Sequence, residues 1–154
     1  GAWLAFRATD LKALLAYTTI AQLGALTMLI GQDTAVAYQG LAVGILAHGL
    51  YKSALFMVAG SVDHGAGTRD LRRLGGLARA MPASFAVAAL AGLSMAGLPP
   101  MFGYLAKEAL VASAWHQTLP YAGQWVLTAG ALAAGAMMTA LAAIFVWETF
   151  GGRS

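Results

Sequence analysis

The stretch LAVGILAHGLYKSALFMVAGSV, residues 41–62, is long and apolar enough to cross a membrane as one helix, because a hydrocarbon core requires about 20 apolar residues per crossing. Two polar residues, His48 and Lys52, interrupt it. Lys52 is too central for its side chain to reach the membrane surface. A charge at the bilayer centre costs at least about 2.5 kcal/mol, so such a residue usually faces a bundle interior or a water-filled cavity and serves a function.

The composition of the whole chain indicates an integral membrane protein. Of 154 residues, 60% are hydrophobic and 10% are charged, whereas soluble domains carry about 25% charged residues. The 19 glycines suit closely packed transmembrane helices. The absence of cysteine excludes disulfides, thiol chemistry and cysteine-ligated metal sites. We expect no cofactor, no metal site and no nucleic-acid partner, since the arginines between apolar stretches indicate a membrane-surface charge bias.

Four apolar stretches predict an all-α, polytopic transmembrane helical bundle with four crossings. They are approximately residues 14–30, 41–62, 83–116 and 122–147. The third stretch is too long for one straight crossing and is broken by GLPPMFGY, Gly97–Tyr104. Its two prolines free carbonyl groups that lipid cannot satisfy, so the break must face protein or water. It is either a functional break of the kind found beside transporter substrate paths, or a re-entrant hairpin or kink with only a packing role.

The basic residues outside these stretches all fall on one predicted side of the membrane. They are Arg7, Lys12, Arg69, Arg72, Arg73, Arg79 and Arg153. The positive-inside rule assigns this side to the cytoplasm, which places both ends of this chain there. Lys52 and Lys107 remain as the two lysines that the membrane must accommodate.

His48 and Lys52 form the strongest candidate site. Their spacing places them on one helix face, about 6 Å apart along the axis. A buried lysine can exchange its proton near physiological pH, and a histidine can pass protons between its ring nitrogens, so the pair predicts a proton relay. The alternative is a histidine that only packs and hydrogen-bonds. Lys107 follows the break and would lie beside water there, whereas spacing alone makes Lys12 an interfacial anchor.

Three segments resemble one known family. They are TDLKALLAYTTIAQLG (residues 9–24), HGLYKSALFMVAGSVDHGAGTRDLRRLGGL (residues 48–77) and SMAGLPPMFGYLAKEAL (residues 94–110). They are similar to the antiporter-like membrane subunits shared by complex I (NADH–quinone oxidoreductase) and the multisubunit Mrp-type Na⁺/H⁺ antiporters. Residues 62–77 most resemble the large A subunit of the Mrp antiporter.

The resemblance implies two inverted helical repeats, each with a broken helix and a half-channel. This chain would be a fragment containing the end of one helix and the rest of the second repeat. The resemblance also implies a chain of protonatable groups along a hydrated axis, formed here by Asp10, Lys12, His48, Lys52 and Lys107. Many relatives carry a further histidine at the position of Gly44, so a water would replace it or the relay would be shorter.

The expected function is proton translocation within a multisubunit Na⁺ (cation)/H⁺ antiporter, through the Lys/His relay. The chain would be a transporter subunit without redox chemistry, and no enzyme by itself. Its partners would be other antiporter subunits, the lipid bilayer, protons and Na⁺, in a bacterial inner membrane. The alternatives are a proton-pumping membrane subunit of complex I, a structural membrane subunit that conducts nothing, and a soluble helical bundle.

Overall fold

The structure is a computed structural model that describes residues 1–116 and 121–152. This part of the chain is all-α, as predicted, and contains six helices. They are α1 (Ala2–Phe6), α2 (Leu11–Ile30), α3 (Ala35–Ala66), α4 (Pro82–Ala96), α5 (Phe102–Trp115) and α6 (Tyr121–Phe150).

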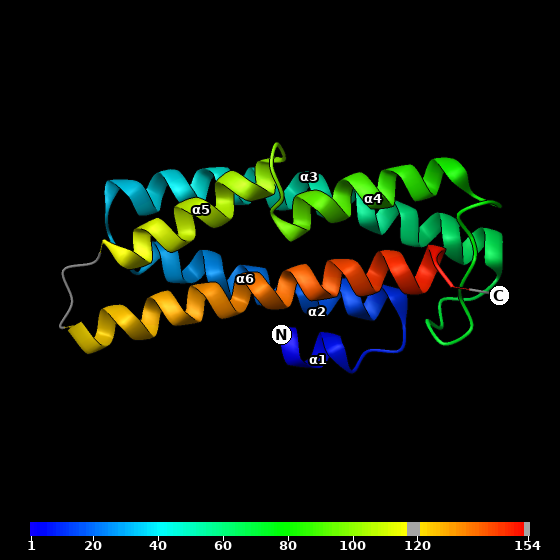
Figure 1. The fold of residues 1–154 in the computed structure, drawn as a ribbon, viewed down its shortest axis with the longest axis horizontal. Helices are drawn as coiled ribbons and strands as arrows, with labels where there is room; N and C mark the ends of the chain where they lie inside the picture. Colours follow the sequence, from blue (N-terminus) through cyan, green and yellow to red (C-terminus); the bar gives the residue numbers. More distant parts are fainter. Residues whose placement is uncertain (117–120, 153–154) are drawn as a thin grey trace.

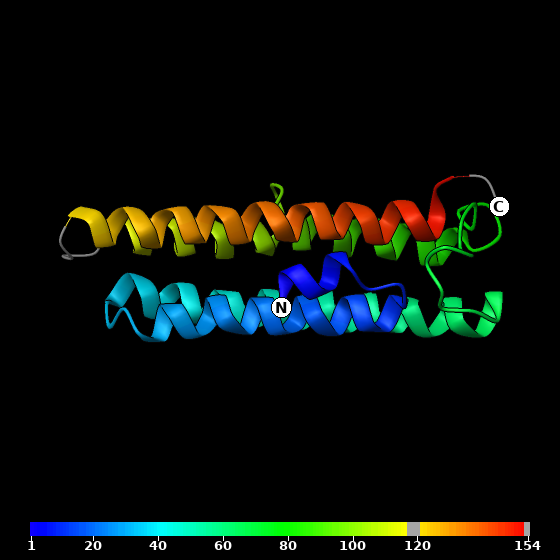
Figure 2. The ribbon, with the colours of Figure 1, turned by 90° about the horizontal axis from the view of Figure 1, so that it is seen from below.

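The helices form two layers (Figure 2). One layer contains α2 and α3, which run antiparallel and are joined by a short turn. The other contains α6 beside α4 and α5, which lie end to end along α3 (Figure 1). The short α1 packs against α2 and α6, between the layers.

Three described helices are long and apolar enough to span a membrane by length and composition, namely α2, α3 and residues Ala122–Phe150 of α6. The helix α4 is apolar but shorter, with 15 residues, and α5 has 14. At 1.5 Å per residue, each covers about 22 Å of a hydrocarbon core about 30 Å thick, so neither is long enough alone. Their end-to-end arrangement agrees with one broken crossing, while the total of four crossings stays a prediction.

The core lies between the two layers. Its largest fully buried side chains include Leu14 of α2, Leu55 of α3, Met95 of α4, and Leu141 and Phe145 of α6. These residues come from both layers, so their burial holds the layers together through the hydrophobic and packing contacts of one continuous cluster.

The outer surfaces of the helices are also apolar. Large exposed hydrophobic side chains include Ile20, Leu46, Met57, Leu90 and Leu132. A helix that is hydrophobic on all sides is either buried or surrounded by lipid. The outward faces therefore suit contact with lipid or with neighbouring transmembrane helices.

Backbone hydrogen bonds tie the chain together at one end of the bundle. The N–H of Leu11 donates to the carbonyl of Arg69 at 3.0 Å, and the N–H of Leu71 donates to the carbonyl of Thr9 at 2.8 Å. The N–H of Gly76 donates to the carbonyl of Gly151 at 2.7 Å. The arginine-rich loop after α3 is thus docked against the start of α2 and the end of α6. Its assignment to the cytoplasmic side stays a prediction, and Arg153 lies outside the described residues.

Candidate functional site

The helix break lies between Ala96 and Phe102, shorter than the predicted Gly97–Tyr104. The helix α4 ends in the left-handed conformation of Gly97, with φ 73°, which glycine adopts without steric cost. Tyr104 is already helical, because its N–H donates to the carbonyl of Met101 at 3.0 Å. The break therefore occupies only the segment around the two prolines.

Gly103 allows the two half-helices to approach closely. A Cβ atom at this position would lie 1.7 Å from the carbonyl oxygen of Ser94, a distance that no real contact allows. The first turn of α5 is thus pressed against the last turn of α4. This contact positions the face of α5 that carries Lys107 over the end of α4.

Lys107 extends back to the carbonyl group that the break leaves free. In an uninterrupted helix the carbonyl of Ala96 would accept from the N–H of residue 100, but Pro100 has none. Lys107 Nζ donates to this carbonyl at 2.6 Å, and also to the carbonyl of Gly135 at 2.9 Å and to Thr139 Oγ1 at 2.9 Å. The three N–H groups of an ammonium match these three acceptors.

Lys52 is buried, with 5% of its surface exposed, and its partners lie on α2. Its Nζ donates to the carbonyl of Leu15 at 2.9 Å and to the hydroxyl of Thr18. That hydroxyl also lies 2.8 Å from the Leu15 carbonyl and 3.1 Å from that of Leu14. Within the described part of the chain, the acceptors of Lys52 are all uncharged oxygens.

His48 contacts Tyr51. Its Nδ1 lies 3.2 Å from Tyr51 Oη, and the two rings meet edge to face with centroids 5.4 Å apart. His48 is half-buried, whereas Tyr51 is buried. Among the hydrogen bonds of the described residues, His48 is thus linked to Tyr51 and Lys52 to α2, although the two share a helix face as predicted from their spacing.

A cavity of about 290 Å³ lies between the two layers and reaches from Tyr51 on α3 to Lys107 on α5. Tyr51 lines it from α3, Lys107 from α5 and Gln22 from α2. Small residues line much of the remaining wall, including Gly44. A Cβ on Gly44 would lie 2.7 Å from a methyl carbon of Leu26. The leucine side chain therefore packs over the glycine.

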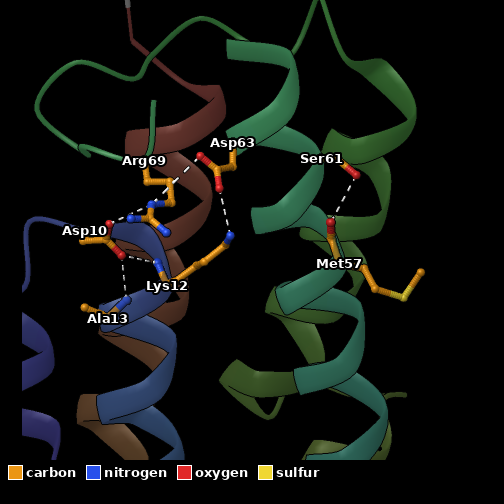
Figure 3. Close-up of polar contacts among 7 residues, drawn as sticks. All are labelled: Asp10, Lys12, Ala13, Met57, Ser61, Asp63 and Arg69. Carbon is orange, nitrogen blue, oxygen red and sulfur yellow. Dashed lines mark hydrogen bonds and ion pairs between the residues drawn. The ribbon is translucent and has the colours of Figure 1, made fainter. Parts of the chain in front are cut away.

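Asp10 and Lys12 belong to a cluster of charges at the entrance of α2 (Figure 3). Asp10 caps this helix by accepting from the N–H groups of Lys12 and Ala13 at 2.9 Å each. Lys12 Nζ lies 2.8 Å from Asp63 Oδ2, and Arg69 Nε lies 3.1 Å from Asp10 Oδ2 and 3.9 Å from Asp63 Oδ1. The cluster ties the start of α2 to the end of α3 and to the loop. Its side chains are about one-third exposed or more.

The loop carries a second ion pair, in which Arg72 is largely exposed and Asp70 is partly buried. Arg72 donates to Asp70 through Nε at 3.0 Å and through Nη2 at 2.9 Å. These hydrogen bonds lower the pKa of the Asp70 carboxyl and raise the pKa of the Arg72 guanidinium. The Asp70–Arg72 pair stabilises the turn that docks on Thr9, and neither of its side chains lines the cavity of about 290 Å³.

Sequence reasoning missed several polar residues of the site: Thr18, Tyr51, Asp63 and Thr139. Tyr51 could have been found, because it lies one helical turn after His48. The two threonines give no comparable signal, since a threonine in an apolar helix satisfies its hydroxyl with a carbonyl of the preceding turn. Asp63 is 51 residues away from Lys12 along the chain, so only the fold brings them together. The described residues contain no group of His, Asp and Glu side chains placed to hold a metal ion.

Comparisons with known proteins agree with the resemblance seen in the sequence. Residues 1–134 match the family described as NADH:quinone oxidoreductase/Mrp antiporter, TM. The probable K⁺/H⁺ antiporter A/B subunit of Rhizobium meliloti is 39% identical over 153 residues, covering 99% of this chain and 15% of that protein. The Na⁺/H⁺ antiporter A subunit of Alkalihalophilus pseudofirmus is 42% identical over 122 residues, covering 70% of this chain and 15% of that protein.

The fold is shared as well. A chain in the structure of the Mrp complex from Dietzia sp. DQ12-45-1b superposes with a TM-score of 0.87 at 39% identity, over 99% of this chain and 18% of that chain. The chain thus spans about 15% of the length of the curated relatives that it matches. The similarity predicted from the three segments is confirmed. The chain belongs to the NADH:quinone oxidoreductase/Mrp antiporter transmembrane family and is a membrane protein.

Proposed function

We propose that this chain takes part in proton translocation within a multisubunit cation/H⁺ antiporter. The observation that carries the proposal is a cavity lined by Lys107 of α5 and by Tyr51 of α3, the residue next to the buried Lys52. Relatives of this chain are antiporter subunits by name. Other antiporter subunits would be its partners, in a bacterial inner membrane with the arginine-rich loop facing the cytoplasm.

The partners of the two lysines suit groups that alternate between protonated and neutral forms. A lysine paired with a buried carboxylate cannot lose its proton without leaving an uncompensated charge. The acceptors of Lys52 and Lys107 are carbonyl and hydroxyl oxygens, so neither lysine leaves such a charge behind. A threonine hydroxyl accepts from the ammonium and can donate to the neutral amine. Thr18 and Thr139 therefore provide a partner for both forms.

The proposed path runs from Lys52 through His48 and Tyr51 to Lys107. His48 would receive a proton on one ring nitrogen and release one from the other. Tyr51 Oη, 3.2 Å from His48 Nδ1, would pass it to the cavity. Waters in the cavity would carry it to Lys107 at the helix break. Asp10 and Lys12 would connect this path to the cytoplasmic surface, because Lys12 lies in the first turn of α2, one turn before Leu15.

Transport by the assembled complex distinguishes the proposed function from the complex I alternative. Everted membrane vesicles are given a pH gradient by respiration, and Na⁺ or K⁺ is then added. An antiporter dissipates the gradient in proportion to the added cation, whereas a complex I subunit supports proton pumping that requires quinone reduction. Pumping that depends on quinone and not on added cation would contradict the antiporter assignment.

A further inference from the structure

The oxygen atoms around Lys107 form a site of their own. We propose that Ala96 O, Gly135 O and Thr139 Oγ1 bind a monovalent alkali cation, and that the Lys107 ammonium occupies this site when no such cation is bound. The inference rests on the proposed function, because it gives the antiporter a place where a proton and a cation exclude each other.

The ligand set suits a singly charged hard cation. The three oxygens lie 2.6, 2.9 and 2.9 Å from Lys107 Nζ and surround a single point. Carbonyl and hydroxyl oxygens are ligands of hard cations. The set contains no carboxylate, and a divalent ion in a protein site is normally bound through carboxylates. A neutral oxygen set that already holds one positive charge therefore favours Na⁺ or K⁺.

The helix break creates the strongest of these ligands. The carbonyl of Ala96 is the last of α4, and Pro100 offers no N–H to bond to it. The C-terminal end of a helix carries a partial negative charge that stabilises cations. Unwound carbonyls and half-helix C-terminal ends bind alkali cations in other transporters with broken helices. The Thr139 hydroxyl lies 3.0 Å from the Ala96 carbonyl and 2.9 Å from the Gly135 carbonyl, and its one proton can bond to either, so the three oxygens are held close together.

A cation can approach this site from two directions. The inner cavity of about 290 Å³ is lined by Lys107 and Gly135. A second, more open cavity of about 580 Å³ is lined by the same two residues, together with Tyr104 and Glu108. Of the three proposed ligands, Gly135 lines both of these cavities, whereas Ala96 and Thr139 line a third, apolar cavity of about 640 Å³. Glu108 lines the more open of the first two cavities.

Few other titratable groups surround the site. Tyr104 and Glu108 belong to the same helix as Lys107, and Tyr51 faces the inner cavity from α3. The helix α4 has no titratable side chain, whereas Glu148 of α6, more than two turns beyond Thr139, lines the cavity that Ala96 and Thr139 also line. Among these groups Lys107 is the one that bonds to all three oxygens, so its charge decides whether they are free. When it releases its proton to cavity water, one cation can enter, so the charge at the site stays the same.

Binding of Na⁺ and K⁺, each measured alone on the purified assembled antiporter by radiolabelled equilibrium binding, tests the inference. The variant Lys107→Met removes the competing ammonium and keeps an unbranched side chain that is one heavy atom shorter. We expect wild-type binding to weaken as pH falls and Lys107→Met binding to be tighter and independent of pH. Adding Thr139→Val to Lys107→Met should weaken binding about tenfold, because it removes one ligand.

Thr128→Val is the matched control, since Thr128 lies on the same helix and its hydroxyl donates, among the residues that the structure describes, to the carbonyl of Gln124 at 2.9 Å. Equal effects of Thr139→Val and Thr128→Val, or the same pH dependence with and without Lys107, would overturn the inference. If Lys107→Met does not assemble, the same comparison of the threonine variants in the wild-type background decides it. Transport by Lys52 variants tests the proposed function separately, because Lys52 contacts none of the three ligands.

Discussion

Lys107 of α5 donates to the hydroxyl of Thr139 on α6, at 2.9 Å. The other membrane lysine, Lys52 of α3, donates in the same way to the hydroxyl of Thr18 on α2. In both cases the threonine also bonds to a carbonyl of the preceding turn, and that carbonyl accepts from the lysine. Each layer of the bundle thus contains one lysine held by a threonine and a carbonyl of the neighbouring helix.

Replacing Thr18 by valine should slow transport. The change keeps the side-chain shape but removes a hydroxyl that serves Lys52 in both protonation states. A hydrogen bond to a charged group contributes about 1.5–3 kcal/mol, so we expect a loss of about tenfold or more in cation-dependent ΔpH dissipation by everted vesicles. Thr27→Val is the control, because the Thr27 hydroxyl bonds to Leu23 of its own helix at 2.9 Å. Equal losses in both variants would exclude a specific role for Thr18.

Replacing Tyr51 by phenylalanine should slow proton transfer without changing the apparent affinity for the cation. The variant keeps the ring that packs edge to face on His48 but removes the hydroxyl at 3.2 Å. We expect the maximal rate to fall about tenfold and the effect of D₂O on it to be at least as large as in the wild type, because proton transfer becomes more rate-limiting. Tyr17→Phe on α2 is the control. An unchanged maximal rate in Tyr51→Phe would remove Tyr51 from the path.

Replacing Gly103 by alanine should prevent the two half-helices from packing. A Cβ would lie 1.7 Å from Ser94 O, so the backbone itself would have to move. Overpacking costs about 1–3 kcal/mol where side chains can adjust, and a backbone clash allows less adjustment. We expect a lower unfolding temperature of the assembled complex and loss of transport. Gly60→Ala, where no atom lies within 4 Å of the new Cβ, should change neither by a comparable amount.

The pair of Lys12 and Asp63 should contribute little to stability. Both side chains are more than one-third exposed, and water and salt screen the attraction within an exposed ion pair. A double-mutant cycle with Lys12→Gln and Asp63→Asn should therefore give a small coupling energy in thermal unfolding. If Lys12 belongs to the proton path, Lys12→Gln should reduce transport by far more than this stability change explains. If the loss of transport in Lys12→Gln is no larger than its loss of stability explains, Lys12 is only an interfacial anchor.

The loop should loosen at acidic pH through Asp70. Hydrogen bonding to Arg72 lowers the pKa of this carboxyl below its ordinary value of 3.8. The stabilisation is therefore complete above that value and is lost as pH falls through the lower pKa of the folded state. Hydrogen exchange of the Arg72 amide, which donates to Asp70 Oδ1 at 3.0 Å, reports this change. Asp70→Asn should remove the pH dependence of this exchange. If exchange in the wild-type loop does not depend on pH in the acidic range, Asp70 does not stabilise the loop.

The sequence predicted those parts of the site that a single helix determines. Lys52 stands out because its neighbours are apolar, and the break stands out because Pro99 and Pro100 cannot continue a helix. The parts that depend on packing between helices could not be predicted. Thr139 lies 32 residues from Lys107 and Thr18 lies 34 residues from Lys52, and nothing local to either threonine marks it as a partner of a lysine.

At the helix break, too, the sequence predicts what a single helix determines but not how the helices pack. Two prolines predict where α4 stops, but the carbonyl of Ala96 could have faced water, lipid headgroups or another side chain. Lys107 reaches it because Gly103 brings α5 onto the end of α4. Of the two interpretations left open by the sequence, a break with only a packing role accounts for Gly103 but not for an ammonium group placed on the freed carbonyl.

If Lys52 carries protons, replacing it should abolish transport, and everted vesicles that contain Lys52 variants show whether it does. Cation-dependent dissipation of ΔpH is compared for wild type, Lys52→Ala and Lys52→Leu, with the amount of assembled complex measured in each preparation. We predict that both variants assemble and that both lose transport to the background level. Lys52→Leu transport equal to that of the wild type, in a complex that is equally or more stable, would contradict the claim and leave the chain with a structural role only.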